Sequence, residues 1–281
     1  MGEILAGEAS AYQPVTGADA PEDALPEPAG TGGADEKEKR IMTEEIIQER
    51  LRANGIPCGP ELSGKLNIYF GLLTEWNARM DLVADAEEDE LLDRHMTDSL
   101  SVLKTELLTG VRTLIDVGTG AGFPGMALAL AMPQIQVTLL DSQQKRLRFL
   151  EEVRKAAGAE NVRLVHARAE DGARKAEMRE QFDCAAARAV APLNVLCEYL
   201  LPYVRVGGRM LCWKGPALAE EMEAGRKAAF LLGGKAGTPV KTEIAGRDWN
   251  HLILPVEKTG KTPKLYPRRA GTPKTNPLGE A

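Results

Sequence analysis

Apolar residues recur at helical spacing across residues 41–110. Ile47 and Leu51 share one face of a short helix predicted over 43–54, where Thr43 is a suitable N-cap. The same spacing predicts a second helix over 60–80 and a third over 87–108. We therefore expect this region to form a helical N-terminal cap.

Downstream, buried-strand runs alternate with helical stretches. The strand runs lie at 112–117, 136–141, 161–166, 182–187 and 208–214, and the helical stretches at about 124–132, 142–157, 192–204 and 217–232. A closing hairpin is predicted from 239–245 and 249–257. Repeated β-α units predict an α/β domain over 111–257, with a mainly parallel, seven-stranded sheet covered by helices on both faces. Ligands of such sheets bind beyond the carboxyl ends of the strands.

Charge is unevenly distributed along the chain. The 281 residues hold 35 Lys and Arg against 41 Asp and Glu, a net charge of −6. Residues 1–40 supply all of it, with nine acids against three bases. Because this segment is rich in Ala, Gly and Pro and poor in aromatic residues, we expect a disordered acidic leader. The neutral remainder is compatible with an RNA partner.

The C-terminal end has the opposite charge. Residues 258–281 carry six bases and one acid, a net charge of +5, together with four prolines. A basic C-terminal arm that touches phosphates is one interpretation. A solvated tail is the other.

Cysteine usage and hydropathy place the protein among cytoplasmic proteins. No apolar run approaches the length of a membrane span, and no secretory signal is recognisable. The four cysteines, Cys58, Cys184, Cys197 and Cys212, form no C-x-x-C pair. We therefore expect no disulfide, no metal site and a reducing compartment.

A glycine-rich loop follows the first predicted strand, over residues 116–125 (DVGTGAGFPG). Its last six residues satisfy G-x-G-x-x-G, the pattern of nicotinamide- and flavin-binding proteins. The Asp116 that ends the strand, the glycines at alternate positions and the preceding helical cap favour S-adenosylmethionine. A tight turn without a ligand remains the structural alternative. Under either ligand, Asp141 is the expected acid for the ribose hydroxyls.

Seven segments in order carry a resemblance to a known family. They are Trp76-Asn77 with Met80-Asp81-Leu82, Arg94–Leu100, Asp116–Gly125, Leu139–Ser142 with Lys145-Arg146 and Phe149-Leu150, Arg168–Glu170, Phe182-Asp183 with Ala187–Ala189 and Trp213–Gly215, and Tyr266–Pro273. Over about residues 42–278 the chain resembles the RsmG (GidB) family of small-subunit ribosomal RNA methyltransferases. Asp81 stands where that family usually has Asn, and Trp213 where it has a smaller apolar residue.

The resemblance implies a Rossmann-like class I methyltransferase that uses S-adenosylmethionine to methylate N7 of one guanine in 16S ribosomal RNA. The partner would be this RNA, or an intermediate of the small subunit, and the protein would work as a monomer. Alternatives are a methyltransferase of the same fold acting on another RNA or a small molecule, an oxidoreductase, and a non-catalytic assembly factor.

The cofactor-binding residues that the resemblance implies lie at the ends of predicted strands. They are Gly118, Gly120, Phe123, Asp141, Ala169, Glu170 and Arg188. Some have a structural alternative: Phe123 as core filling, Asp141 as a helix cap and Glu170 as a solvated loop charge.

The candidate substrate-binding residues are Arg94, His95, Asp98, Lys214, Arg268 and Arg269. Helical spacing predicts that Asp98 holds Arg94 in an ion pair. His95 is equally compatible with a core position, and Lys214 with a surface lysine. Because guanine N7 already carries a free lone pair, we expect no essential catalytic His or Cys.

Overall fold

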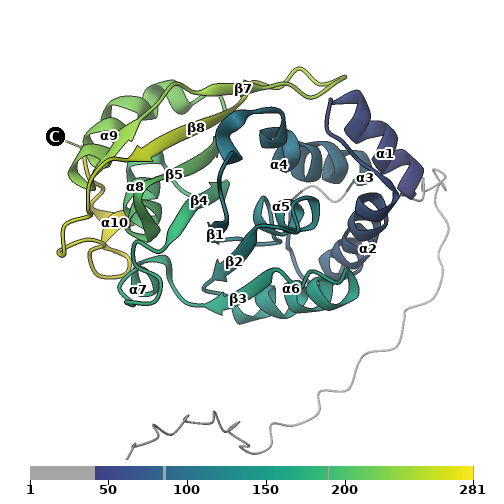
Figure 1. The fold of residues 1–281 in the computed structure, drawn as a ribbon, viewed down its shortest axis with the longest axis horizontal. Coiled ribbons are helices and arrows are strands. Elements are labelled where there is room, and N and C mark those ends of the chain that lie inside the picture. The colour runs from purple at the N-terminus through teal and green to yellow at the C-terminus, as the bar shows by residue number, and fades with distance from the viewer. Residues whose placement is uncertain (1–41, 85–86, 189, 281) are drawn as a thin grey trace, which may run out of the picture. The chain divides into compact units, whose positions relative to one another are not determined.

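A mixed β-sheet forms the centre of the computed structural model, which describes residues 42–84, 87–188 and 190–280 (Figure 1). Its strands are β1 Thr113–Val117, β2 Gln136–Asp141, β3 Val162–His166, β4 Phe182–Arg188, β5 Val204–Lys214, β6 Gly234–Ala236, β7 Val240–Thr242 and β8 His251–Lys258. Their order is β3-β2-β1-β4-β5-β8-β6, with β7 also paired to β8. The first five are parallel, and β8 is antiparallel to its three partners. The predicted acidic leader lies outside the described residues.

The sheet has eight strands, one more than the sequence predicts. The predicted closing hairpin is confirmed, since β7 and β8 pair with Val240 opposite Ile253. The additional strand is β6, a Gly-Lys-Ala segment that carries no apolar alternation and is held by its pairing with β8. Pairing with a neighbour, which a local pattern does not reveal, therefore accounts for the difference.

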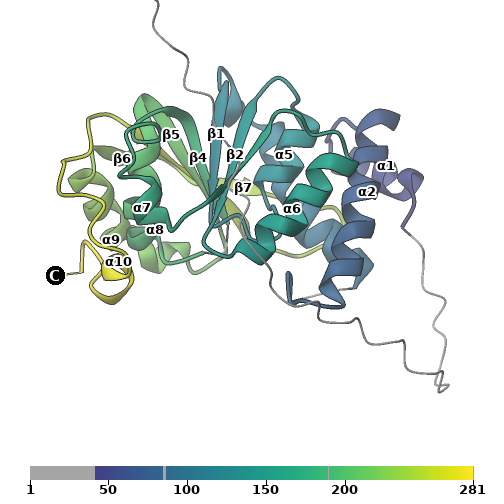
Figure 2. The same ribbon diagram turned by 90° about the horizontal axis from the view of Figure 1, so that it is seen from below.

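Helices cover both faces of the sheet (Figure 2). One face carries α1 Glu44–Ala53, α2 Pro60–Asn77, α5 Gly125–Ala131 and α6 Gln144–Ala156; the other carries α7 Ala169–Gly172, α8 Leu193–Leu200, α9 Leu218–Leu231 and α10 Thr272–Thr275. Adjacent residues of β1 serve opposite cores, with Leu114 in one and Ile115 in the other. The predicted α/β class is confirmed, whereas the short helices α7 and α10 were not predicted.

The cap helices pack against the sheet layer and belong with it to one compact unit. The Thr43 hydroxyl accepts a hydrogen bond from the Ile46 amide, as an N-cap does. On α2, the indole of Trp76 donates to Glu152 of α6, and Tyr69 packs between Phe123 and Phe149. The cap thereby reaches the loop that follows β1.

The third predicted helix, over 87–108, is broken into short pieces. These are α3 Glu88–Glu90, a π-helical stretch Leu91–Thr97, α4 Asp98–Leu100 and two 3₁₀ turns, Ser101–Lys104 and Glu106–Leu108. Side chains take carbonyls that a regular helix uses: the Thr97 hydroxyl donates to Leu92 and the Trp213 indole to Asp98. The prediction of one continuous α-helix is wrong, because residues 88–104 change from α to π and 3₁₀ geometry and Thr105 then interrupts the helix. Such π-helical stretches are frequent at functional sites.

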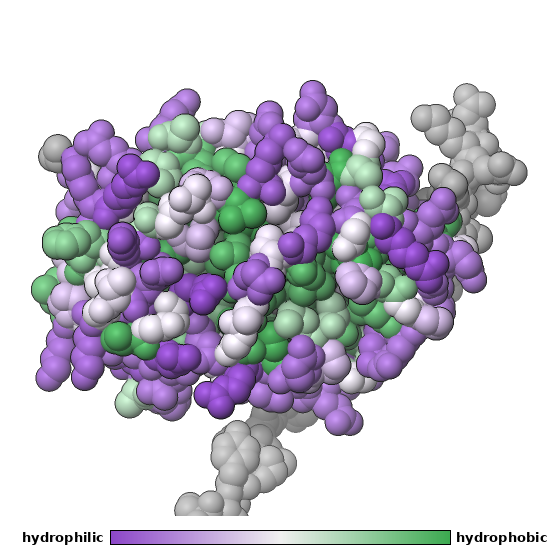
Figure 3. Space-filling model, turned by 45° about the horizontal axis from the view of Figure 1, so that its top comes forward, coloured by the Kyte–Doolittle hydropathy of each residue, from purple (hydrophilic) through white to green (hydrophobic). Residues whose placement is uncertain are grey.

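The crevice of the sheet lies where the strand order reverses, because β1 has β2 on one side and β4 on the other. On the face that Figure 3 shows, hydrophilic side chains cover most of the surface and a hydrophobic band is exposed near the middle. Among the described helices, none is both long enough and apolar enough to cross a membrane.

Candidate active site

The glycine loop leaves β1 and is pinned to the neighbouring strand. The amides of Gly118 and Thr119 both donate to the Leu140 carbonyl of β2, at 2.8 and 3.1 Å. Gly118 and Gly120 have φ values of 73° and 58°, a region that side chains disfavour. The backbone of this loop therefore forms one wall of the crevice.

Asp116 holds the loop from beneath. Its buried Oδ2 accepts hydrogen bonds from the Thr119 hydroxyl at 2.7 Å and from the Gly125 amide, the first residue of α5, at 2.9 Å. Oδ1 has no partner among the described residues. Burial raises the pKa of Asp116 to about 6, although both hydrogen bonds oppose this shift.

Asp141, at the end of β2, holds the chain on both sides of the crevice. Its Oδ1 accepts the amide of Gln143, the residue before α6, and its Oδ2 accepts the amide of Gly120 at 2.9 Å. Arg146 lies 3.5 Å from the same carboxylate. Because an ionised carboxylate offers about four acceptor positions, Asp141 retains capacity for hydroxyl donors.

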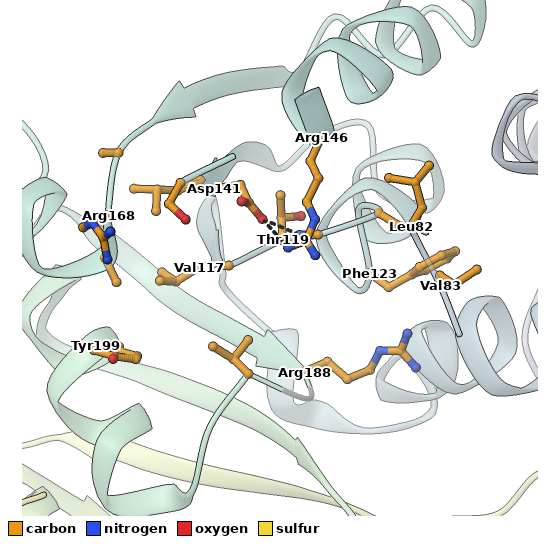
Figure 4. A pocket seen from close by; sticks show the side chains of 18 of the residues that line it. Leu82, Val83, Val117, Thr119, Phe123, Asp141, Arg146, Arg168, Arg188 and Tyr199 are labelled. Atoms are coloured by element: carbon orange, nitrogen blue, oxygen red, sulfur yellow. Dashed lines mark hydrogen bonds and ion pairs between the residues drawn. The ribbon is translucent and has the colours of Figure 1, made fainter. Parts of the chain in front are cut away.

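A cavity of about 590 Å³ opens beyond the ends of β1, β2, β3 and β4. All seven predicted cofactor residues line it: Gly118, Gly120, Phe123, Asp141, Ala169, Glu170 and Arg188. Figure 4 shows Arg188 reaching toward Phe123 at one end, while Tyr199 and Arg168 lie at the other. Glu170 is buried and accepts the Gly271 amide at 2.8 Å, so it is not a solvated loop charge.

Sequence reasoning missed other residues that line this cavity. They include Leu82 and Val83 from the cap, Arg146 and Tyr199 from helices, and Gly271 and Lys274 from the C-terminal segment. Leu82, Arg146 and Gly271 lie in segments that carry the family resemblance, so these three had a signal in the sequence. The others reach the cavity through tertiary packing.

Arg188 forms the partition between this cavity and a second one. Its guanidinium donates to the Arg94 carbonyl at 2.6 Å and to His95 Nδ1, lies 3.5 Å from Asp98, and covers the ring of Phe123. His95 also stacks on Phe123. Burial, reinforced by the charges of Arg188 and Arg94, lowers the pKa of His95 to about 3. His95 is therefore a neutral acceptor at pH 7.

The second cavity measures about 300 Å³ and shares His95 and Arg188 with the first. Its other lining residues are Arg94, Asp98, Trp213, Lys214, Gly215, Glu221 and His251. Four of the six candidate substrate-binding residues line this cavity: Arg94, His95, Asp98 and Lys214. Glu221 and His251 were missed, because α9 and β8 reach the cavity only in the folded chain.

The ion pairs around this cavity differ from the predicted one. Asp98 meets Arg188 and His251, whereas Arg94 pairs with Glu90 one turn earlier. The predicted Arg94–Asp98 pair is therefore wrong, since the π-helical turn between them alters the helical spacing.

The C-terminal segment folds back onto the sheet layer instead of extending as an arm. Lys258 is buried beside Glu180, and Arg268 pairs with the fully buried Glu198 at 2.6 Å. Arg268 is thus committed to the fold, which argues against the predicted phosphate contact. A buried carboxylate on α8 requires such a partner. Arg269, by contrast, is exposed.

The first cavity fits S-adenosylmethionine in the chemistry of its lining. Asp141 supplies a carboxylate at the end of β2, where the ribose is expected, and the buried carboxylate of Glu170 lies with the Ala169 backbone at the end expected for adenine. At the Gly118 position, φ is 73° and a Cβ would approach the Val190 side chain to 3.2 Å, so a side chain is disfavoured in this wall. Its volume lies within the range of small-molecule sites.

The protein is a class I S-adenosylmethionine-dependent methyltransferase, as the order of the strands, the glycine loop and the acid that ends β2 together indicate. The fold is similar to that of a cofactor-bound protein from MTB, with a TM-score of 0.50 and 19% identity, over 78% of this chain and 99% of that one.

The family follows from sequence comparison. The model of the family rRNA small subunit methyltransferase G matches residues 63–248. Relatives named ribosomal RNA small subunit methyltransferase G include those of Clostridium perfringens, 45% identical, and Alkaliphilus metalliredigens, 46% identical. Each match covers 83% of this chain and 98% of the relative. The chain belongs to this family and is an S-adenosylmethionine-dependent ribosomal RNA methyltransferase.

Proposed function

We propose that the protein transfers the methyl group of S-adenosylmethionine to N7 of one guanine in 16S ribosomal RNA. The family membership supports the cofactor and the class of substrate. The resemblance found in the sequence supports N7 as the position.

The main support for this proposal is that the carboxylates around the second cavity are held in ion pairs. Among the described residues, Asp98 and Glu221 are its only carboxylates, and each is held in an ion pair, with Arg188 and with Lys214. His95, with its pKa lowered to about 3, is a poor proton acceptor at neutral pH. The remaining histidine, His251, is held by the Asp98 carboxylate at 3.0 Å, so the acids and histidines of this cavity are engaged within the fold. Guanine N7 has no proton to lose.

The chain's task is then to align N7 with the methyl group rather than to activate it. When bound, S-adenosylmethionine supplies an electrophilic methyl group on a sulfonium sulfur. Orientation of two reactants can lower a barrier by roughly 7–11 kcal/mol. We assign Arg188 and Phe123 to the methyl end of the cofactor cavity, because they adjoin the partition to the second cavity.

The remaining cofactor residues divide along the cavity. Asp141 accepts hydrogen bonds from the ribose, and Ala169 with Glu170 contacts the adenine. Gly118 and Gly120 let the backbone approach the methionine end. Among the basic residues, Arg94 lines the second cavity and Arg269 is exposed, so both are accessible to RNA phosphates.

We also propose a cytoplasmic monomer that acts on the RNA itself or on an assembly intermediate of the small subunit. All four cysteines are free and buried, which fits a reducing compartment.

Mass spectrometry of ribosomal RNA nucleosides from cells that lack this gene tests the proposal. We expect the 7-methylguanosine of 16S RNA to be lost and to return when the gene is restored. Unchanged 7-methylguanosine, with a different methylated nucleoside missing, would instead indicate a methyltransferase of the same fold with another substrate.

A further inference from the structure

We propose that Lys214 and Glu221 select the target base by reading the Watson–Crick edge of guanine in the second cavity. This inference rests on the proposed function and deepens it, because it assigns base selection to a pair of side chains. Lys214 ends β5, and Glu221 lies in the first turn of α9. Both line the second cavity.

The two side chains are held in fixed positions. Lys214 Nζ lies 2.5 Å from Glu221 Oε2 and donates to the Ala191 carbonyl at 3.2 Å. The same Oε2 accepts the Leu193 amide at 2.6 Å. Since Lys214 is 10% exposed and Glu221 24% exposed, neither is a freely moving surface charge.

Each member of the pair keeps one unused hydrogen-bonding group. A lysine ammonium has three donors, and two of those of Lys214 have acceptors in the fold. The Oε1 atom of Glu221 has no hydrogen-bond partner among the described residues. A donor and an acceptor therefore remain side by side at the wall of the cavity.

This combination matches guanine and opposes adenine. The Watson–Crick edge of guanine offers the O6 acceptor next to the N1–H and N2–H donors. Lys214 can donate to O6 while Glu221 accepts from N1–H or N2–H. Adenine presents the reverse pattern, so its N6 amine would face the ammonium and its N1 lone pair would face the carboxylate.

The same arrangement turns the reactive atom, guanine N7, toward the cofactor cavity. In guanine, O6 lies between N1 and N7 along the ring edge. A base held through O6 and N1 therefore presents N7 on the side away from Glu221. The walls that the second cavity shares with the cofactor cavity are His95 and Arg188. Two hydrogen bonds thus select the base and point N7 toward the methyl donor.

Steady-state methylation of small-subunit RNA from cells that lack the gene tests this inference. We expect Glu221→Gln to lower kcat/KM by roughly tenfold to a hundredfold, the usual discrimination of a two-bond base contact. The Kd for S-adenosylmethionine should change less than about twofold, because Glu221 does not line the first cavity. Glu223→Gln is the matched control, since Glu223 lies on the same helix and pairs with Lys227 outside both cavities.

Base selection separates this role from a structural one. The second substrate is RNA with adenine at the position that the wild-type enzyme methylates, and the ratio of kcat/KM for guanine over adenine is measured. We expect Glu221→Gln and, independently, Lys214→Met to lower this ratio at least about tenfold. Loss of rate with an unchanged ratio in both variants would overturn the inference, as would wild-type behaviour of both. If the wild-type enzyme forms no 7-methylguanosine at all, the proposed function itself fails.

Discussion

The two cavities are built in different ways. Backbone at the ends of β1, β2 and β3 forms much of the first, through the Gly118–Gly120 loop and the Ala169–Glu170 turn. Paired charged side chains from α4, β4, β5, α9 and β8 form most of the second. The backbone conformation at the ends of these strands can thus hold a cofactor. Substrate selection in this protein instead depends on charges that neutralise one another in the fold.

Replacing Arg188 should have the largest effect, because this residue lines both cavities. Replacing it with Ala leaves the Asp98 carboxylate, 4% exposed, without its guanidinium. We expect Arg188→Ala to lower the methyl-transfer rate by roughly a hundredfold or more. Single-turnover kinetics with S-adenosylmethionine measure this directly. Wild-type turnover by the variant would remove Arg188 from the site.

The C-terminal segment tests whether an ion pair can also shape the first cavity. Gly271 and Lys274 line that cavity, and the Arg268–Glu198 pair anchors the segment that carries them. Arg268→Ala strands a fully buried carboxylate, so we expect a loss of about 3–5 kcal/mol in the free energy of unfolding. Denaturant titration measures it.

Arg269→Ala is the matched control for stability, because the neighbouring guanidinium is exposed. We expect it to shift the free energy of unfolding by less than about 0.5 kcal/mol. Equal stability of the two variants would show that the segment is a solvated tail.

A substitution in the glycine loop tests whether cofactor binding in the first cavity depends on backbone conformation. A Cβ at Gly120 has free space, but its φ of 58° makes any side chain costly by roughly 1–2 kcal/mol. We expect Gly120→Ala to weaken S-adenosylmethionine binding by about tenfold in calorimetry, because the loop relaxes away from Asp141. Gly246→Ala, with a similar φ of 78° and free space far from the cavity, should leave the affinity unchanged. Equal affinities of both variants would contradict the contrast.

The smallest expected effect is a pH dependence of the free energy of unfolding that comes from His95, which contacts Arg188 between the two cavities. The pKa of His95 is about 3 in the fold against an ordinary value of 6.5, so the unfolded chain takes up the proton first as pH falls. Stability is therefore lost progressively below about pH 6.5, by roughly 1–2 kcal/mol at pH 5. His95→Asn retains an acceptor for Arg188 and cannot titrate.

Unfolding free energies of the wild type and His95→Asn between pH 7 and 5 measure this contribution. The wild type should show the steeper loss of stability. Parallel curves would mean that His95 takes up its proton as readily in the folded protein as in the unfolded chain.

The contrast also explains what the sequence could reveal. Gly118 and Gly120 follow β1 directly and Asp141 ends β2, so the local pattern suffices to place them at the same edge of the sheet. Glu221 and His251 are unremarkable in sequence and reach the second cavity only through long-range pairing of β5 with β8 and packing of α9. The ion pair of Arg268 with Glu198 could not be predicted, because Glu198 lies 70 residues earlier on α8.

A crystal structure with bound S-adenosylhomocysteine will show whether the first cavity holds the cofactor and in which direction. We expect ribose hydroxyls on Asp141, adenine beside Ala169 and Glu170, and the sulfur turned toward Arg188 and the second cavity. Adenosine at the Arg188 end, or binding outside this cavity, would contradict it.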